Sequence, residues 1–311
     1  MRSIQNDYQK TLRQPIEING IALHSGRAAR AVIYPARENR GIVFRRADLP
    51  GQPEIGAHYR NVTSTQMATT LGRGQVAIGT IEHLMAGLAV LGVDNAVIEV
   101  YGPEIPILDG SSRVFCEAIM KSGIEIQRKK KAVLAIRKRI ELKINEKWAV
   151  AEPSSQLEVH GSIEFDHPSI GYQEYHYIED KTDITQLLPA RTFGFLKEVQ
   201  MLQKVGLARG GSLENAVVLD HISVLNPDGL RFPNEFARHK VLDALGDLKL
   251  AGISICGHFR MHRAGHDLHT KLLEEIFRNP ENYEILAEDE SEENYTQTVT
   301  TLGTPRLASS Y

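Results

Sequence analysis

The sequence contains few cysteines and no long apolar run, and each of these absences excludes a class of protein. Two cysteines in 311 residues, Cys116 and Cys256, supply neither a disulfide framework nor a cysteine-rich zinc knuckle. No uninterrupted apolar run approaches the ~20 residues that cross a bilayer, and the N-terminus has no apolar segment of the kind that directs secretion. We therefore expect a cytoplasmic protein without stable membrane insertion.

Neither sign of charge is in large excess, because the formal net charge is only −3. This value argues against a general polyanion binder, and we expect no nucleic-acid partner. The composition, 42% hydrophobic and 24% charged, is that of an ordinary soluble globular protein. A chain of this length can form one large domain or two small ones with their own cores.

Strands followed by a helix are indicated in both halves of the chain. Residues 14–33 predict a β-hairpin that turns at Asn19-Gly20, and residues 81–91 have helical apolar spacing after Thr80, which can cap the helix. The order recurs in outline after the basic stretch 128–131, which we interpret as a linker. We therefore predict two similar α+β domains, at residues 1–127 and 132–283, and a disordered acidic tail at 284–311.

Two short elements carry the residues best suited to chemistry. His239 and Asp243 lie four residues apart in an apolar helical pattern, so their side chains share one face of the helix. Glu82-His83 opens an earlier apolar helix. A zinc hydrolase typically uses three protein ligands and leaves a fourth position for water, and His83 is the best third ligand. Adjacent helical residues diverge by roughly 100°, so Glu82 suits a general base better than a ligand.

Other interpretations of these residues remain open at this level. An imidazole and a carboxylate one helical turn apart can simply stabilise the helix. A second group of histidines also has spacing compatible with a metal, although Gly257 and Gly265 argue against a continuous helix through it. Spacing alone does not decide between the two clusters. The second group consists of His258, His262, His266 and His269.

Seven segments together form a specific pattern. They are GIALHSG at 20–26, TIEHLMAGL at 80–88, EIPILDGS at 104–111, ARTFGF at 190–195, NAVV at 215–218, the run 230–248 and Gly265-His266. In this order, over roughly residues 9–280, they closely resemble the bacterial UDP-3-O-acyl-N-acetylglucosamine deacetylases. These are zinc enzymes of the committed step in lipid A biosynthesis. The resemblance implies two two-layer α/β sandwich domains packed together, with the active site between them and a βαβ insertion in the second.

The resemblance also implies a role for each site residue. The metal ligands are then His83, His239 and Asp243, and Glu82 is the general base. His266 is the general acid, kept protonated by Asp247, while Thr192 and Lys240 line the site. His258, His262 and His269 are left without a role. The implied cofactor is Zn²⁺, although two nitrogens and one oxygen also suit Fe²⁺.

The implied reaction is hydrolysis of the 2-acetamido group of an acylated UDP-glucosamine, which yields acetate and the free amine. By the same resemblance, Phe193 and Phe195 belong to the apolar passage for the acyl chain, in the segment 193–207. Phe165 is placed to stack on uracil, and Lys240 and Arg263 face the diphosphate. The family also implies a monomer.

Two rival functions remain at this stage. One is a zinc amidohydrolase that uses the same metal ligands on a different N-acyl substrate. The other is a nucleic-acid-binding module, because residues 128–139 are basic and two-layer α+β units also occur in RNA-associated proteins. The negative net charge, and the position of a possible general base beside a metal ligand, argue against the nucleic-acid-binding function.

Overall fold

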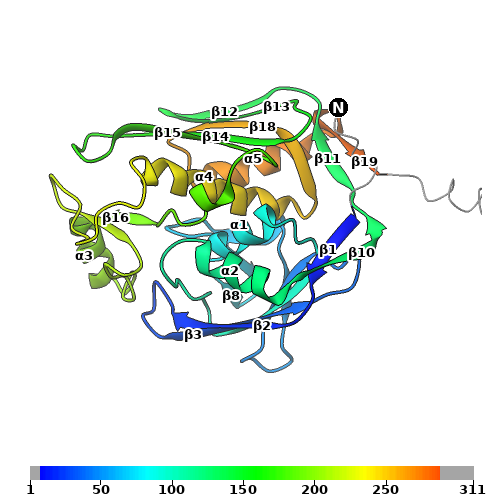
Figure 1. Ribbon diagram of the computed structural model, residues 1–311, viewed down its shortest axis with the longest axis horizontal. Coiled ribbons are helices and arrows are strands. Elements are labelled where there is room, and N and C mark those ends of the chain that lie inside the picture. The colour runs from blue at the N-terminus through cyan, green and yellow to red at the C-terminus, as the bar shows by residue number, and fades with distance from the viewer. Residues whose placement is uncertain (1–7, 288–311) are drawn as a thin grey trace, which may run out of the picture.

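The computed structural model describes residues 8–287, and its architecture is the predicted α+β fold. Two large sheets form the outer layers, and the central helices lie between them (Figure 1). The helices are α1 (Glu82–Val90), α2 (Arg113–Ser122), α4 (Glu235–Leu248) and α5 (His266–Arg278). Within residues 8–287, none of the helices combines the length and apolar character needed to cross a membrane.

The first half of the chain forms a five-stranded sheet in the order β2-β3-β9-β4-β5. Burial alternates along β9, as expected for a strand with one face on a core. A smaller antiparallel sheet, β6-β7-β8, lies in the same half. The strands are β2 (Ile16–Ile21), β3 (Ala28–Pro35), β4 (Ile42–Arg46), β5 (Glu54–Gly56), β6 (Val62–Ser64), β7 (Thr70–Arg73), β8 (Val76–Ile78) and β9 (Ala96–Tyr101).

The predicted hairpin is present as β2 and β3, but the predicted turn is wrong. Asn19 and Gly20 lie inside β2, and the chain turns between Ala22 and Arg27, where Gly26 has a φ of 68°. A Cβ at position 20 would lie 3.1 Å from the Cβ of Pro106. The glycine therefore serves a close tertiary approach, and this contact, not local turn propensity, explains its presence.

The second half forms a seven-stranded sheet around the long strand β18. β18 pairs antiparallel with β13 and parallel with β11 and β14, while β14 also pairs with β15. The order along the main path is β12-β13-β18-β11-β19. The strands are β11 (Val133–Ile136), β12 (Ile140–Ile144), β13 (Lys147–Glu152), β14 (Leu157–Phe165), β15 (Gly171–Ile178), β18 (Ser254–His262) and β19 (Tyr283–Leu286).

Two predicted segment assignments differ from the structure. Residues 128–130, expected in a linker, belong to strand β10 (Ile124–Lys130), which pairs antiparallel with β1 (Tyr8–Leu12). Residues 284–286, expected in the tail, belong to β19, which pairs with β11 and is anchored by the contact between Tyr283 and Phe277. Sheet pairing therefore overrides the polar composition of both segments. The division into two domains stays a prediction, and the rest of the predicted tail, 288–311, lies outside the described residues.

The predicted βαβ insertion in the second half is confirmed. Strand β16 (Phe193–Phe195) leads directly into α3 (Leu196–Lys204), and β17 (Val217–Leu219) then pairs parallel with β16. This unit projects at one end of the molecule, away from the central helices (Figure 1).

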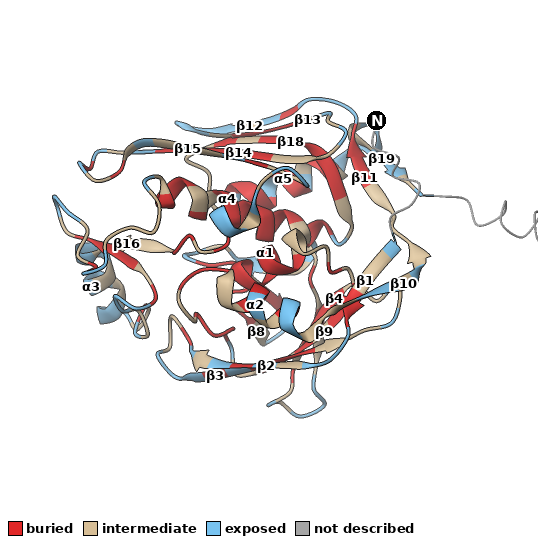
Figure 2. Ribbon diagram, viewed as in Figure 1, coloured by how far each residue is buried: buried red, intermediate tan, exposed pale blue. Residues whose placement is uncertain are grey.

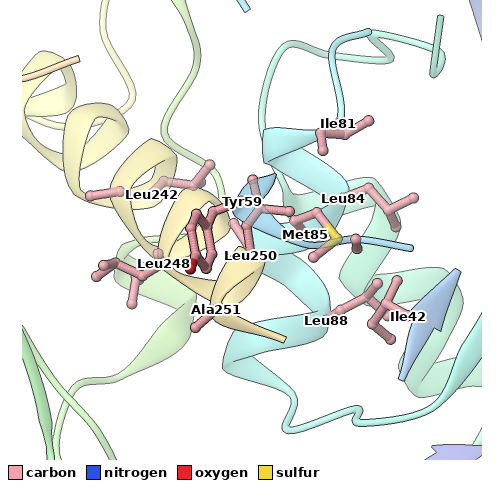
Figure 3. Packing of buried hydrophobic residues seen from close by; sticks show 14 of the residues in the cluster. Ile42, Tyr59, Ile81, Leu84, Met85, Leu88, Leu242, Leu248, Leu250 and Ala251 are labelled. Carbon is pink, nitrogen blue, oxygen red and sulfur yellow. The ribbon is translucent and has the colours of Figure 1, made fainter. Parts of the chain in front are cut away.

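The two halves meet where α1 packs on α4. Apolar side chains from both helices are buried there, as Figure 2 shows for the helices and Figure 3 for the side chains. A Cβ at Gly246 would lie only 2.1 Å from the carbonyl oxygen of Glu82, so this close approach requires glycine. The contact therefore places the start of α1 beside the C-terminal part of α4. Labelled in Figure 3 are Ile81, Leu84, Met85 and Leu88 of the first half and Leu242, Leu248, Leu250 and Ala251 of the second.

Candidate metal centre and active site

Three of the predicted site residues converge at the contact between α1 and α4. The Nε2 atoms of His83 and His239 lie 3.6 and 3.2 Å from Oδ1 of Asp243. Ligand atoms of a tetrahedral zinc site with bonds near 2.0–2.1 Å are separated by about 3.3 Å. All three residues are buried. The two histidines and the aspartate therefore form a group that can hold a metal ion.

The hydrogen bonds described around this group do not occupy Nε2 of His239 or Oδ1 of Asp243. The Nδ1 atom of His239 lies 3.0 Å from the carbonyl oxygen of Ala190, so Nδ1–H donates and Nε2 keeps its lone pair. Lys240 donates to Oδ2 of Asp243 over 2.6 Å. Oδ1 of Asp243 is buried and accepts no hydrogen bond from residues 8–287. A buried carboxylate oxygen without a donor is costly, and a cation would satisfy it.

The charge states of these residues also suit a cation. Burial lowers the pKa of His239 to about 3, so its imidazole is neutral at physiological pH, as a metal ligand must be. Burial alone would raise the pKa of Asp243, but its charged and hydrogen-bonded neighbours, among them the Lys240 ammonium, outweigh burial and hold that pKa well below its usual range. The site therefore presents a neutral imidazole from His239 and a carboxylate from Asp243.

Glu82 lies beside this group on the first turn of α1. Its side chain is buried, its Oε2 accepts the backbone N–H of Thr69 at 3.1 Å, and its Oε1 lies 3.9 Å from Nε2 of His266. Burial raises the pKa of Glu82, and this makes its carboxylate a better proton acceptor than an exposed one.

The turn that leads into α1 is strained. Thr80 has a φ of 57°, in the left-handed region that a β-branched residue rarely adopts. Its hydroxyl is buried and makes no hydrogen bond within residues 8–287, so the predicted capping role of Thr80 is wrong. A residue held in this conformation costs of order 1–3 kcal/mol, which the surrounding packing must offset. This strain lies two residues before Glu82.

His266 opens α5 and bonds to Asp247. Its Nδ1 lies 2.7 Å from Oδ2 of Asp247. Burial alone would lower the pKa of His266, but the adjacent carboxylate outweighs burial and raises it to about 9. The same pairing keeps the pKa of Asp247 at about 2, against the effect of burial. At neutral pH the pair is an imidazolium held by a carboxylate, with Nε2–H of His266 directed toward Glu82.

Sequence reasoning missed two residues of this site. His269, which the resemblance left without a role, places Nδ1 2.8 Å from the same Oδ2 of Asp247. The hydroxyl of Thr69 donates to Oδ1 of Asp247 over 2.6 Å. Spacing could have identified His269, because it lies three residues after His266 on one helix. Nothing in the local sequence marks Thr69, which arrives from the other half of the chain.

Two cavities adjoin the candidate site residues. One, of about 410 Å³, is mainly apolar, follows the βαβ insertion and includes Thr192, Phe193, Val199 and Leu202. The other, of about 780 Å³, is lined by more polar residues and includes His266 and Arg263. Met67 lines both cavities. A ligand with an apolar chain and a polar head would therefore find matching surfaces on either side.

The remaining predicted substrate residues lie on nearby elements. Phe165 ends β14 and its ring packs against those of Phe193 and Phe195, at centroid distances of 5.9 and 5.8 Å. Arg263 follows β18, the parallel neighbour of β14, and pairs with Glu146. Phe165 lies at the C-terminal end of β14, and Arg263 lies just beyond the C-terminal end of the parallel strand β18. The two residues therefore approach the same end of the sheet. Their contact with a nucleotide stays a prediction.

Comparison with known proteins gives the same family over almost the whole chain. A family model described as UDP-3-O-acyl N-acetylglycosamine deacetylase matches residues 9–278. The chain is 44% identical over 279 residues to the UDP-3-O-acyl-N-acetylglucosamine deacetylase of Myxococcus xanthus, which covers 89% of each protein. It is 41% identical over 288 residues to the enzyme of that name from Pasteurella multocida, covering 91% of this chain and 94% of the relative. The chain therefore belongs to the UDP-3-O-acyl-N-acetylglucosamine deacetylase family.

Proposed function

We propose that this protein removes the 2-acetyl group of UDP-3-O-(3-hydroxyacyl)-N-acetylglucosamine by metal-dependent hydrolysis, the committed step of lipid A biosynthesis. The relatives named above are deacetylases of this substrate class. The observation that carries the proposal is the convergence of His83, His239 and Asp243 beside Glu82 and His266. The products are acetate and the free amine, which keeps its 3-O-acyl chain.

The proposed metal ligands are His83, His239 and Asp243. A second group, Asp247 with His266 and His269, also has compatible distances. In that group, however, the carboxylate oxygen already accepts from both imidazole Nδ1–H groups. In the first group the Asp243 oxygen is without a donor. We therefore assign the cation to the first group, and two nitrogens with one oxygen favour Zn²⁺ and also suit Fe²⁺.

Proton transfer is assigned to Glu82 and His266. A bound divalent cation would polarise the acetamide carbonyl and lower the pKa of water at the site. Glu82, with its raised pKa, accepts the proton of the attacking water. His266 is protonated at neutral pH and donates to the leaving nitrogen, because an amide nitrogen cannot depart as an anion. Asp247 orients His266 through the Nδ1–H bond and keeps it charged.

Stabilisation of the developing oxyanion is assigned to Thr192 and His266, which supply a hydroxyl and a positive charge. Lys240 makes a charge-assisted bond to Asp243, and this fixes the carboxylate that faces the metal position. Its Nζ also lies 5.7 Å from the centre of the Phe193 ring, so Lys240 stands between the metal group and the apolar cavity.

The two cavities suggest how the substrate lies. The apolar cavity along α3 suits the 3-O-acyl chain, and the polar cavity beside His266 suits the sugar nucleotide. Phe165 is proposed to stack on uracil, and Lys240 and Arg263 to face the diphosphate.

The proposal is tested by measuring acetate release from the acylated UDP-sugar and from simple N-acetyl sugars. We expect turnover of the first only, and comparable turnover of both would favour an amidohydrolase of other specificity. The Glu82→Gln variant should lose turnover while it keeps its metal, as measured by elemental analysis. Loss of metal together with activity would instead mean that Glu82 is a ligand.

A further inference from the structure

A second group of imidazole and carboxylate side chains lies on the outer face of the seven-stranded sheet. Successive residues of a strand point to opposite faces. Gly161 of β14 faces α4, because a Cβ there would lie 2.7 Å from Cγ2 of Val241. His160 and Glu158, at odd spacing from Gly161, therefore point away from the helices. This outer face is partly exposed (Figure 2) and lies across the sheet from the catalytic residues.

Pairing of three strands brings the members of this group together. Glu158 of β14 lies directly opposite His258 of the parallel strand β18. On the other side of β14, Nε2 of His176 in β15 lies 3.3 Å from Oε2 of Glu158. The rings of His176 and His258 stack with centroids 5.4 Å apart. One potential ligand atom from each of Glu158, His176 and His258 lies within 4.8 Å of the other two.

The ligand atoms of this group are available for a cation. Nε2 of His258 is buried and has no hydrogen-bond partner among the residues that the structure describes. Ser154 donates to Oε1 of Glu158 over 2.8 Å, which orients the carboxylate and leaves Oε2 facing His176. The 3.3 Å separation matches the roughly 3.3 Å between ligand atoms of a tetrahedral zinc site.

We propose that Glu158, His176 and His258 form a second metal site, which binds Zn²⁺ or a similar divalent transition-metal ion on the outer face of the sheet. Two imidazoles and one carboxylate are a ligand set that these ions accept. The ion would join β14, β15 and β18. This inference is independent of the proposed catalytic function, because none of its residues belongs to the catalytic group.

The test is the number of zinc ions bound per chain, measured by equilibrium dialysis against Zn²⁺ and elemental analysis. Wild-type protein should bind two ions at saturation. The His258→Asn and Glu158→Gln variants should each bind one ion and keep deacetylase activity. The His239→Ala variant should bind one ion and lose activity. The matched control is His262→Asn, because His262 lies on the same strand and face but bonds to Ser162, and this variant should bind two.

Two outcomes would overturn the second site. One is a single ion in wild-type protein, and the other is a second ion that persists in both His258→Asn and Glu158→Gln. The catalytic assignment fails separately, if His239→Ala keeps both ions or keeps activity. A second readout is the unfolding temperature of protein already loaded with one zinc ion. Added Zn²⁺ should raise this temperature in wild-type and His262→Asn protein and leave it unchanged in His258→Asn.

Discussion

The replacement Asp247→Asn tests the proposed general acid most directly. Asparagine keeps the size of the side chain but removes the negative charge that His266 contacts at 2.7 Å. Asp247 is not among the proposed metal ligands, so the variant should keep its metal. The change therefore acts on the protonation of His266 and leaves the metal group in place.

The structure sets the size of the effect. Raising the pKa of His266 from 6.5 to about 9 corresponds to about 3 kcal/mol of favourable interaction for its charged form. Burial opposes this charge, so without the carboxylate the pKa should fall to 6.5 or below. At pH 7.5 nearly all of the wild-type His266 is protonated, whereas at most roughly a tenth would be in the variant. We expect turnover at this pH to fall at least about tenfold.

The assay is the pH profile of kcat for acetate release. Activity that requires protonated His266 is present below its pKa and lost as the pH rises through it. In wild-type protein this alkaline limb should lie near pH 9, and in Asp247→Asn it should move to pH 6.5 or lower. Thr69→Val is the matched control, because it removes a hydrogen bond to the same carboxylate but keeps the charge. An alkaline limb that stays near pH 9 in Asp247→Asn would refute the assignment.

Three further replacements test other parts of the reasoning. Gly246→Ala should lower the free energy of unfolding by about 2 kcal/mol or more and reduce the metal content. A Cβ at this position would lie 2.1 Å from the backbone of Glu82 and would force α1 away from α4. Chemical denaturation measures the first effect and elemental analysis the second. His266→Ala should lower kcat by about 10²–10⁴-fold with little change in KM, and steady-state kinetics in which KM alone rises would contradict the acid role. Val199→Trp should fill part of the apolar cavity and lower kcat/KM for long-chain substrates more than for short-chain ones, whereas Met201→Trp, on an exposed part of the same helix, should not.

The local sequence was sufficient to predict the features that helical geometry fixes. His239 and Asp243 share a face of α4 because they are four residues apart, and Glu82 and His83 diverge because they are adjacent. The βαβ insertion was also expected, although from family resemblance and not from spacing. Features set by long-range packing were predicted less well. Asn19 and Gly20 have the composition of a turn but lie within a strand, because pairing with β3 and the approach of Pro106 outweigh local propensity.

The sequence by itself determined which side chains could act together within one element, because the helical repeat fixes their relative directions. Only the tertiary structure decided which elements meet. The separation of His83 from Asp243 depends on the packing of α1 on α4, which is possible because Gly246 has no side chain. The contact of Asp247 with Thr69 also joins the two halves, whereas its contact with His269 depends on the packing of α5 on α4. Spacing along the chain is fixed by covalent geometry, whereas this convergence comes from burial of apolar surface between two distant halves.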